Sequence, residues 1–387
     1  MKRRLLDILM CPLDITPLEL MEWETVPAVL SGDAIERIKS LGHNFSAFSS
    51  EILTGVLVNR AKKIFYPIHR GIPRLLIFPT KLTREFAQVH AQRLNKELPG
   101  FNLPNEVPPP GEENVLRSFS REWTSYDWNP RAYWNLSVQD MYRTMRFLLD
   151  LDRKPVKKEK LILEVGIGIG GIADYISRSE ESELVGVDLG YAVDAAYKNF
   201  GHNPLLHILQ ASVFFLPFKK STFNFVYSHG VIMATYSTKI AFSNLAKLPR
   251  TGGRLYVWVY SPYEEERTLK RRVLMKMERV VRPALSRLPE TLQTIGLLPF
   301  IPLYLVHQNL HVKHSGLGYA AYGWREAMHA ARDRFTPRYA SRHTEEEVCG
   351  WFREAGYSQI QCMSGREVPD YVPKEFVTAA VVDGVQT

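Results

Sequence analysis

The sequence predicts an α/β protein in which helices cover a mostly parallel sheet, with a smaller β-rich module at the N-terminus. Two observations carry this prediction. After about residue 115, short apolar strand candidates alternate with helix patterns, and before about residue 78, prolines and glycines punctuate short apolar segments. Strands that alternate regularly with helices form parallel sheets with both faces covered. A chain of 387 residues is long enough for two domains.

Shifts in composition divide the chain into three units. Residues 1–78 form the N-terminal module, a β-rich α+β unit that ends in a proline- and glycine-rich run. Residues 79–114 are predicted to contain an amphipathic helix over 81–98 and then a stiff linker, because five prolines lie within residues 99–111. Residues 115–387 form the larger domain.

The larger domain is predicted to interleave seven strands with helices. Its last helix begins at Thr344, because Thr344 and Glu347 have the spacing of a capping box. The other predicted helices cover 137–151 behind the N-cap Ser137, begin at Gly171, pass through 193–197 and cover 238–248. The predicted strands are 160–165, 183–187, 205–210, 223–228, 254–260, 357–363 and 376–382.

A glycine-rich turn follows the first of these strands. Gly166, Gly168 and Gly170 permit a tight turn and a close approach of the backbone to a ligand. The helix behind the turn directs free N–H groups toward that ligand. The second strand is followed at once by Asp188, whose carboxylate can accept hydrogen bonds from both ribose hydroxyls. The combination indicates a nucleoside ligand at the carboxyl edge of the sheet.

Over roughly residues 115–385 the sequence resembles the class I S-adenosylmethionine-dependent methyltransferases. The matching features are Glu164 before the glycines, the fourth-strand segment 216–231, the turn 248–257, and residues 354–357 with the two strands that follow. The resemblance implies a Rossmann-like, seven-stranded, mostly parallel sheet with a terminal antiparallel hairpin, and S-adenosyl-L-methionine as cofactor. The cofactor-binding residues expected here are Glu164, Gly166, Ile167, Gly168, Gly170, Asp188, Leu189, Ser212, Val213 and Ser228.

Two positions depart from the family pattern. The aspartate that often meets the adenine amino group is replaced by Ser212, a weaker acceptor, and the aspartate before the fourth strand is Asn224. The Ser212 replacement leaves open a non-catalytic protein that binds S-adenosylmethionine. The glycines alone would also fit a turn that binds no nucleotide, or a dinucleotide dehydrogenase. Neither of these explains the fourth-strand and hairpin features.

Methyl transfer requires a nucleophile in line with the methyl group and the exclusion of water. His229, at the end of the fourth strand, is the catalytic candidate, either as a base or as a wall of the pocket. Arg338, Tyr339 and His343 are the substrate-binding candidates, unless they only support the Thr344 cap. Trp123 and Tyr126 either cover the sulfonium by cation–π contact or simply pack.

The N-terminal module resembles the small zinc-knuckle subunit that activates tRNA, rRNA and release-factor methyltransferases. The resemblance is carried by Cys11-Pro12, Gly55–Lys62 and the run 66–73. The four ligand positions of that family are here Cys11, Asp14, Asn59 and Lys62. A lysine ammonium cannot ligate zinc and an asparagine amide is a poor ligand, so we expect the shape without a metal. The implied role is a fused stabilising or docking module.

The formal charge of +8 favours anionic partners without choosing among them. An insertion at about 262–335 concentrates basic residues and then an apolar run, 295–306. Three interpretations are open: a lid over the pocket, a membrane-surface contact through 267–306, or an RNA backbone contact. The basic residues are Arg267, Lys270, Arg271, Arg272, Lys276, Arg279, Arg282 and Arg287.

The function that these observations favour is O-methylation of a small or carrier-linked molecule, such as a sugar or a lipid-linked glycan. Methylation of RNA or of a translation protein is the second possibility. The N-terminus shows no signal-peptide pattern, no apolar run is long enough to span a bilayer, and three scattered cysteines, Cys11, Cys349 and Cys362, predict no disulfide framework. We therefore expect a cytoplasmic protein, with peripheral membrane association left open.

Overall fold

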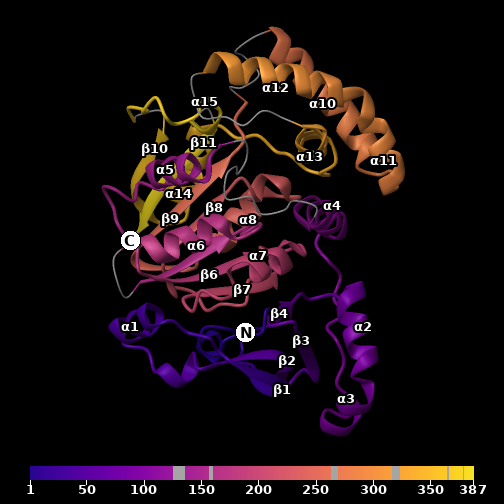
Figure 1. The fold of residues 1–387 in the computed structure, drawn as a ribbon, viewed down its shortest axis with the longest axis vertical. Coiled ribbons are helices and arrows are strands. Elements are labelled where there is room, and N and C mark those ends of the chain that lie inside the picture. Colours follow the sequence, from indigo (N-terminus) through magenta and orange to yellow (C-terminus); the bar gives the residue numbers. More distant parts are fainter. Residues whose placement is uncertain (125–135, 157–159, 263–268, 316–322, 364–365, 378) are drawn as a thin grey trace.

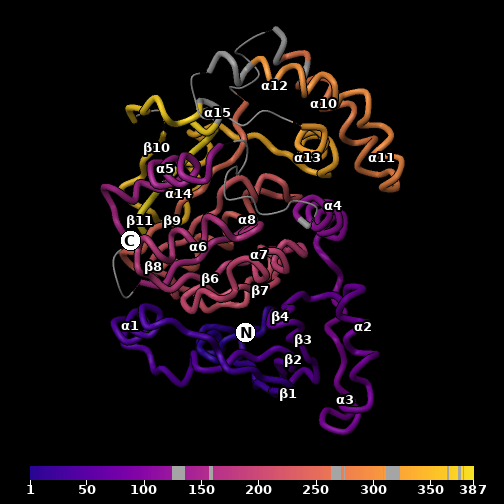
Figure 2. Tube along the Cα trace, viewed as in Figure 1, coloured from indigo at the N-terminus to yellow at the C-terminus, as the bar shows by residue number. Residues whose placement is uncertain are grey.

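One continuous sheet runs through the molecule. The computed structural model describes residues 1–124, 136–156, 160–262, 269–315, 323–363, 366–377 and 379–387. Within these residues eleven strands form a single sheet in the order β1-β2-β3-β4-β7-β6-β5-β8-β9-β11-β10 (Figure 1). The N-terminal module lies at one end of the molecule and the insertion helices lie at the other, with the larger domain between them (Figure 2).

The N-terminal module is an antiparallel arrangement of four strands with short helices. Its strands are β1 (Glu19–Pro27), β2 (Ser50–Asn59), β3 (Ile64–His69) and β4 (Ile72–Leu75). The helix α1 (Gly32–Ser40) is capped by Ser31, whose Oγ accepts a hydrogen bond from the backbone N–H of Ala34 at 3.2 Å. Alternating buried residues on β2 and β3 pack the module against the larger domain on one side and against α2 on the other.

A parallel strand pair joins the module to the larger domain. Arg74 and Leu75 of β4 lie opposite Gln210 and Ala211 of β7 (Leu206–Ala211). The Arg74 side chain is fully buried, and its guanidinium donates two hydrogen bonds to the Asp194 carboxylate, at 2.7 and 3.0 Å. The module therefore extends the edge of the larger domain's sheet as well as packing on it.

The larger domain has the predicted topology. Strands β5, β6, β7, β8 and β9 are parallel, and β11 pairs antiparallel with both β9 and β10. This confirms the mostly parallel seven-stranded sheet with a terminal antiparallel hairpin. The strands are β5 (Leu161–Val165), β6 (Glu183–Asp188), β7, β8 (Phe223–His229), β9 (Pro249–Val259), β10 (Tyr357–Cys362) and β11 (Ala380–Gln386).

Most helices of this domain begin where the sequence predicts. Ser137 caps α5 and Thr344 caps α14, in each case by accepting a hydrogen bond from the backbone N–H three residues later. The reciprocal half of the capping box is replaced, because the Glu347 carboxylate bonds to the His343 ring. The helices are α5 (Val138–Leu148), α6 (Gly171–Ser179), α7 (Ala192–Phe200), α8 (Thr238–Leu245) and α14 (Glu345–Glu354).

The helix predicted over 81–98 is two helices, α2 (Lys81–Val89) and α3 (Ala91–Glu97). The chain leaves helical geometry at His90, whose ring packs against Phe86 and Trp23. The break lets both helices place apolar side chains on the outer face of β2 and β3. The proline-rich segment that follows contains no helix and packs back on the module, where Glu106 N–H donates to Ile77 O at 2.9 Å.

The C-terminal hairpin differs from the prediction in two details. The predicted strand 376–382 begins instead in a short helix, α15 (Lys374–Val377), and β11 starts at Ala380, where its pairing with β9 begins. Cys349 and Cys362 meet as a disulfide pair, although the scattered cysteines predict no disulfide framework. The tight turn at Gly356 brings β10 back along α14, which places the Cα atoms of the two cysteines 7.6 Å apart.

The insertion forms a helical layer with a small core of its own. Its helices are α10 (Leu269–Leu285), α11 (Glu290–Leu297), α12 (Ile301–Ser315) and α13 (Trp324–Phe335). The core residues are Leu285, Leu297, Ile301, Ala327, Ala331 and Phe335. No helix among the described residues is long and apolar enough to cross a bilayer. The helix α4 (Glu112–Thr124) lies between this layer and α7, so the insertion covers the carboxyl edge of the sheet (Figure 1).

Candidate active site

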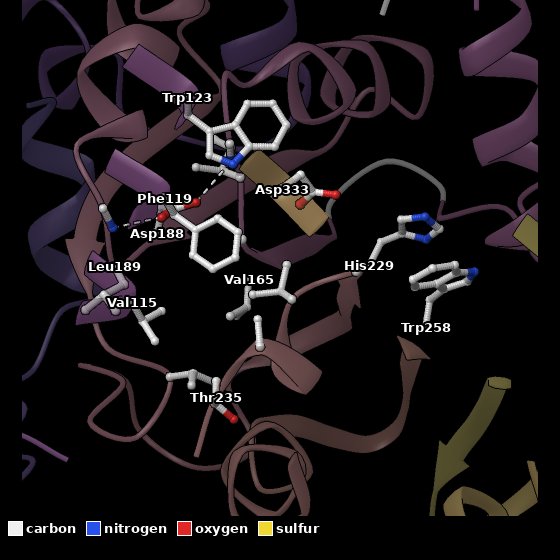
Figure 3. A pocket seen from close by; sticks show the side chains of 18 of the residues that line it. Val115, Phe119, Trp123, Val165, Asp188, Leu189, His229, Thr235, Trp258 and Asp333 are labelled. Carbon is white, nitrogen blue, oxygen red and sulfur yellow. Dashed lines mark hydrogen bonds between the residues drawn. The ribbon is translucent and has the colours of Figure 1, made fainter. Parts of the chain in front are cut away.

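A cavity of about 540 Å³ opens at the carboxyl ends of the parallel strands. Its lining residues come from the glycine turn and the ends of β6 and β8, from α4, and from the insertion helices α10, α12 and α13. We call the part formed by the glycine turn, β6 and α4 the cofactor half, and the part formed by β8, β9 and the insertion the acceptor half. Figure 3 shows side chains of both halves facing the cavity.

The glycine turn requires glycine at Gly166. Gly166 has φ +92°, and a Cβ there would lie 2.1 Å from the Val231 Cγ2 atom. Gly168 and Gly170 also have positive φ. Gly166, Ile167 and Gly168 line the cavity, whereas Gly170 is the N-cap of α6 and lies outside the lining.

Asp188 is held by the same turn. Its carboxylate accepts hydrogen bonds from the backbone N–H of Gly168 at 3.1 Å and of Gly190 at 2.8 Å (Figure 3). Burial raises the pKa of Asp188 to about 6, although these backbone donors oppose the rise. The carboxylate is thus fixed in place at the cavity wall, with oxygen capacity remaining for hydroxyl donors.

Glu164 is the more strongly perturbed carboxyl. Burial, with a smaller contribution from the charge of Asp188, raises its pKa to about 8, and its Oε2 atom has no hydrogen-bond partner. A buried carboxyl oxygen without a partner is costly, so it favours a cationic or hydrogen-bond-donating ligand. The ammonium and the ribose hydroxyls of S-adenosylmethionine supply such donors, and the residues present therefore fit this cofactor.

Glu112, which the sequence analysis missed, supplies a third carboxyl. It is the first residue of α4 and lines the cavity, and its Oε1 atom accepts a hydrogen bond from the Ser212 hydroxyl. Its Oε2 atom is buried without a partner, and burial raises its pKa to about 7 while the Ser212 bond lowers it. A carboxyl thus stands beside the position where Ser212 replaces the family's acid. The only sequence signal was an acid at the first position of a helix, 100 residues from Ser212.

The remaining cofactor candidates divide into two groups. Leu189 and Val213 line the cavity. Ser212 and Ser228 are buried outside it, and the Ser228 hydroxyl donates to Val165 O at 3.1 Å. Trp123 lines the cavity from α4, and Tyr126 lies outside the described residues.

His229 lines the acceptor half at the end of β8. Its ring stacks on Trp258, with centroids 4.9 Å apart (Figure 3). Its Nδ1 atom lies 3.2 Å from the Tyr256 hydroxyl. Burial lowers the pKa of His229 to about 3, so its imidazole is neutral at physiological pH. A neutral imidazole can accept a hydrogen bond, but it is a weak base.

The three substrate candidates do not line the cavity. The Tyr339 hydroxyl donates to Pro110 O at 3.0 Å, Arg338 stacks on Tyr339, and the His343 ring bonds to Glu347. Different cations line the acceptor half, and they come from the insertion and the segment after it: Arg282, Arg334 and Arg342. Sequence reasoning identified Arg282 only as part of a basic run.

The four zinc-ligand positions of the N-terminal module meet in the structure. The Asn59 amide donates to both Asp14 oxygens, at 3.1 and 3.2 Å, and Lys62 Nζ lies 3.9 Å from Asp14 Oδ2. Cys11 Sγ contacts the Tyr66 hydroxyl at 3.4 Å. Asp14 is therefore hydrogen-bonded by an amide and paired with the Lys62 ammonium, and the described residues contain no cluster of three or more metal-ligating side chains.

The sheet order, the glycine turn and the acids at the ends of β5 and β6 define a class I S-adenosylmethionine-dependent methyltransferase. Residues 163–257 match the family model described as a methyltransferase domain, and residues 2–71 match that of the Trm112p-like proteins. The chain is thus an S-adenosylmethionine-dependent methyltransferase with a Trm112p-like domain at its N-terminus.

Solved structures show similarity at low sequence identity. One is the complex of the Haloferax volcanii Trm112 methyltransferase activator with a putative methyltransferase, at 14% identity over 72% of this chain and 99% of that chain, with a TM-score of 0.40. A possible histamine N-methyltransferase from Thermotoga maritima matches at 14% identity over 72% of this chain and 98% of that chain, with a TM-score of 0.37. Magnesium protoporphyrin IX methyltransferase from Synechocystis PCC 6803 matches at 12% identity over 79% and 99%, with a TM-score of 0.35.

Proposed function

We propose that this methyltransferase acts on a hydroxyl oxygen of a small or carrier-linked molecule, such as a sugar or a lipid-linked glycan. The observation that carries this proposal is the covered acceptor half, in which insertion helices close over β8 and β9. A cavity of about 540 Å³ accommodates the cofactor and one compact acceptor group. In this proposal the insertion acts as a lid, one of the three interpretations that the sequence left open, and excludes water from the reaction.

In this proposal the cofactor half holds the donor. The backbone of the glycine turn approaches it, Asp188 accepts the ribose hydroxyls, Glu164 faces the methionine ammonium, and Glu112 accepts the adenine amino group. Leu189 and Val213 provide the apolar walls beside the base. When bound, the donor supplies an activated methyl group: its carbon–sulfur bond breaks with the electron pair kept by sulfur, as a carbon–oxygen bond forms.

The acceptor half orients the hydroxyl and takes its proton. His229, held by Tyr256 and Trp258, accepts a hydrogen bond from the hydroxyl and fixes its direction. Asp333 of α13 also faces the cavity (Figure 3). Burial raises the pKa of Asp333 to about 6, while Arg282 and Arg334 oppose the rise, so Asp333 is ionised near pH 7 and is the stronger base.

Two measurements test the proposal. Calorimetric titration of the wild-type protein with S-adenosylhomocysteine should give measurable binding, and Asp188→Ala should weaken it by about 100-fold, since two charge-assisted hydrogen bonds are lost. Incubation with methyl-labelled S-adenosylmethionine and fractionated cell extract should then label small or lipid-linked molecules, with a bond that resists mild alkali. Absence of cofactor binding, or label found in RNA or protein, would overturn the proposal.

We also propose that the insertion contacts an anionic membrane surface. On α10, the exposed apolar residues Val273, Met277 and Val280 recur at helical spacing, so they form one stripe. The exposed cations Arg272, Lys276 and Arg279 each precede one of them, which places a basic stripe beside the apolar one. This pairing is typical of helices that lie in the headgroup region of anionic bilayers.

The other insertion helices α11 and α12 also expose apolar side chains. Ile295 is 61% exposed on α11, and Leu303 and Val306 of α12 are 66% and 61% exposed. Flotation with vesicles of phosphatidylglycerol and phosphatidylcholine should carry the protein upward, and flotation with phosphatidylcholine alone should not. A Val280→Ser, Leu303→Ser, Val306→Ser variant should lose flotation while keeping S-adenosylhomocysteine binding. Equal flotation of the variant and the wild type would contradict the contact.

A further inference from the structure

Three arginines converge on one glutamate at the end of the cavity formed by the insertion. Glu278 of α10 is 3% exposed, and its Oε1 atom accepts hydrogen bonds from Arg282 at 2.5 Å and from Arg342 at 3.0 Å. Its Oε2 atom accepts a bond from Arg334 Nε at 3.0 Å. The residues belong to α10, α13 and the segment that follows α13, so the insertion fold assembles the cluster.

One buried donor of this cluster is left without a partner. Three guanidiniums, which stay protonated at any relevant pH, face the carboxyls of Glu278 and Asp333. Arg282 is 8% exposed, and its Nε–H has no hydrogen-bond partner. A buried guanidinium donor without a partner is costly, so Arg282 favours an anion within the cavity that can accept its hydrogen bond.

The position of the cluster separates it from an ordinary structural ion network. All five charged residues line the cavity instead of being sealed in the core of the insertion, which consists of apolar side chains. The Tyr260 and Tyr304 rings line the same end of the cavity, and Arg342 lies over the Tyr260 ring at 5.8 Å. Guanidiniums with aromatic neighbours are well suited to bind planar or tetrahedral oxyanions.

We infer that Arg282, Arg334 and Arg342 bind an oxyanion, a phosphate or a carboxylate, that the acceptor molecule carries. This inference rests on the proposed function, because it assigns the charge of the molecule that the acceptor half receives. Anchoring the anion at this end of the cavity leaves the acceptor hydroxyl to reach toward His229 and the donor methyl. The methylated group and the anionic group then belong to one molecule, in keeping with a sugar phosphate or a phosphate-linked carrier lipid.

The probes are inorganic phosphate, pyrophosphate and acetate, titrated into the full-length protein saturated with S-adenosylhomocysteine, at constant ionic strength with chloride. Phosphate or acetate should bind the wild type, and Arg342→Gln should weaken that binding by about tenfold, the value of one charge-assisted contact. Arg287→Gln, the same charge change at an exposed position of the α10 end, is the matched control and should bind as the wild type does.

Glu278→Gln distinguishes an anion site from a purely structural network, because only an anion site predicts that oxyanion binding becomes tighter in this variant. Removing the glutamate charge increases the net positive charge of the three-arginine cluster, so oxyanion binding should tighten severalfold even if the melting temperature falls. A purely structural network would lose stability without a gain in binding. Preference for phosphate over acetate, or the reverse, identifies the oxyanion.

Each outcome decides between the two proposals. No binding of any probe to the wild type, equal binding by Arg342→Gln, or weaker binding by Glu278→Gln overturns the oxyanion site. If the wild-type protein does not bind S-adenosylhomocysteine, the proposed function is overturned instead. Retained cofactor affinity in Arg342→Gln shows that this variant is folded, so its loss of phosphate binding can be assigned to the cluster.

Discussion

The two halves of the cavity bury ionisable groups of opposite charge. The cofactor half buries carboxyls, and burial raises the pKa values of Asp188, Glu112 and Glu164 to about 6, 7 and 8. The acceptor half buries guanidiniums, which cannot shed their charge and share one glutamate. The first half therefore suits a ligand that brings cations and hydrogen-bond donors, and the second suits a ligand that brings an anion.

The largest effect is expected at Gly166. Gly166→Ala places a methyl group against Val231 in a backbone conformation of φ +92°, so it should abolish S-adenosylhomocysteine binding, by at least about 100-fold in a calorimetric titration. Gly252→Ala is the matched control, since Gly252 has φ +75° but no atom within 4 Å of the added methyl. The control should lose about 1 kcal/mol of stability and keep its affinity. If Gly166→Ala and Gly252→Ala bind S-adenosylhomocysteine with the same affinity, the backbone at Gly166 does not approach the donor closely.

A smaller effect is expected at Glu112. Glu112→Ala should weaken S-adenosylhomocysteine binding about tenfold, because the carboxyl that replaces the family's acid is removed. The analogue with inosine in place of adenosine lacks the amino group, so the wild type should prefer the adenosine form and the variant should not. An unchanged preference in Glu112→Ala would show that Glu112 does not meet the base.

The cofactor half should also release protons on binding. The Glu164 carboxyl is largely protonated at pH 7, and a ligand ammonium beside its free oxygen would lower its pKa. Titrations of S-adenosylhomocysteine in PIPES and Tris, which differ in ionisation enthalpy, should therefore show release of up to one proton. Glu164→Gln should remove most of this release. Identical heats in both buffers would argue against a protonated Glu164.

The same three carboxyls contribute to the pH dependence of stability without cofactor. Their folded-state pKa values lie above their usual values, so the folded state binds more protons than the unfolded state between about pH 4.5 and 8. Their contribution to the free energy of unfolding should therefore fall as pH rises through this range. Glu164→Gln should flatten the fall between pH 6.5 and 8, where histidines with lowered pKa values such as His229 no longer oppose it. Urea denaturation at pH 5, 6, 7 and 8 measures it. The same pH dependence in Glu164→Gln and in the wild type between pH 6.5 and 8 would contradict the buried carboxyl.

The sequence predicted more of the residues of the cofactor half than of the acceptor half. The glycine turn and Asp188 lie in short contiguous segments, where strand, turn and acid follow one another, so their roles could be read locally. Glu112 and Ser212 are 100 residues apart, and only the fold brings them together. Arg338, Tyr339 and His343 were favoured because they cluster in sequence, whereas the cavity is lined by Arg334, which precedes them, and by Arg342, which lies between Tyr339 and His343. Local spacing does not determine which side of an irregular segment faces inward.

The pairing of β4 with β7, which joins the two sheets, could not be predicted from the sequence either. The run 66–73 indicated short strands, but nothing in it shows that β4 would pair with β7, because strand pairing between segments far apart depends on edges that only the assembled sheet exposes. The break at His90 has a similar cause. The periodicity over 81–98 is helical throughout, and contacts of the His90 ring with Phe86 and Trp23 override it.

The smallest effect is expected at His229, which lies in the acceptor half yet is buried among rings. Because burial lowers its pKa to about 3, its imidazole proton signals in NMR should not titrate between pH 5 and 8. His229→Gln should change S-adenosylhomocysteine affinity by less than about twofold, since the side chain contacts Trp258 and Tyr256 and no part of the cofactor half. A titration midpoint above pH 6 would make His229 a competent base and remove the need for Asp333. A large loss of cofactor affinity would show that the two halves are energetically coupled, and the division between them would then fail.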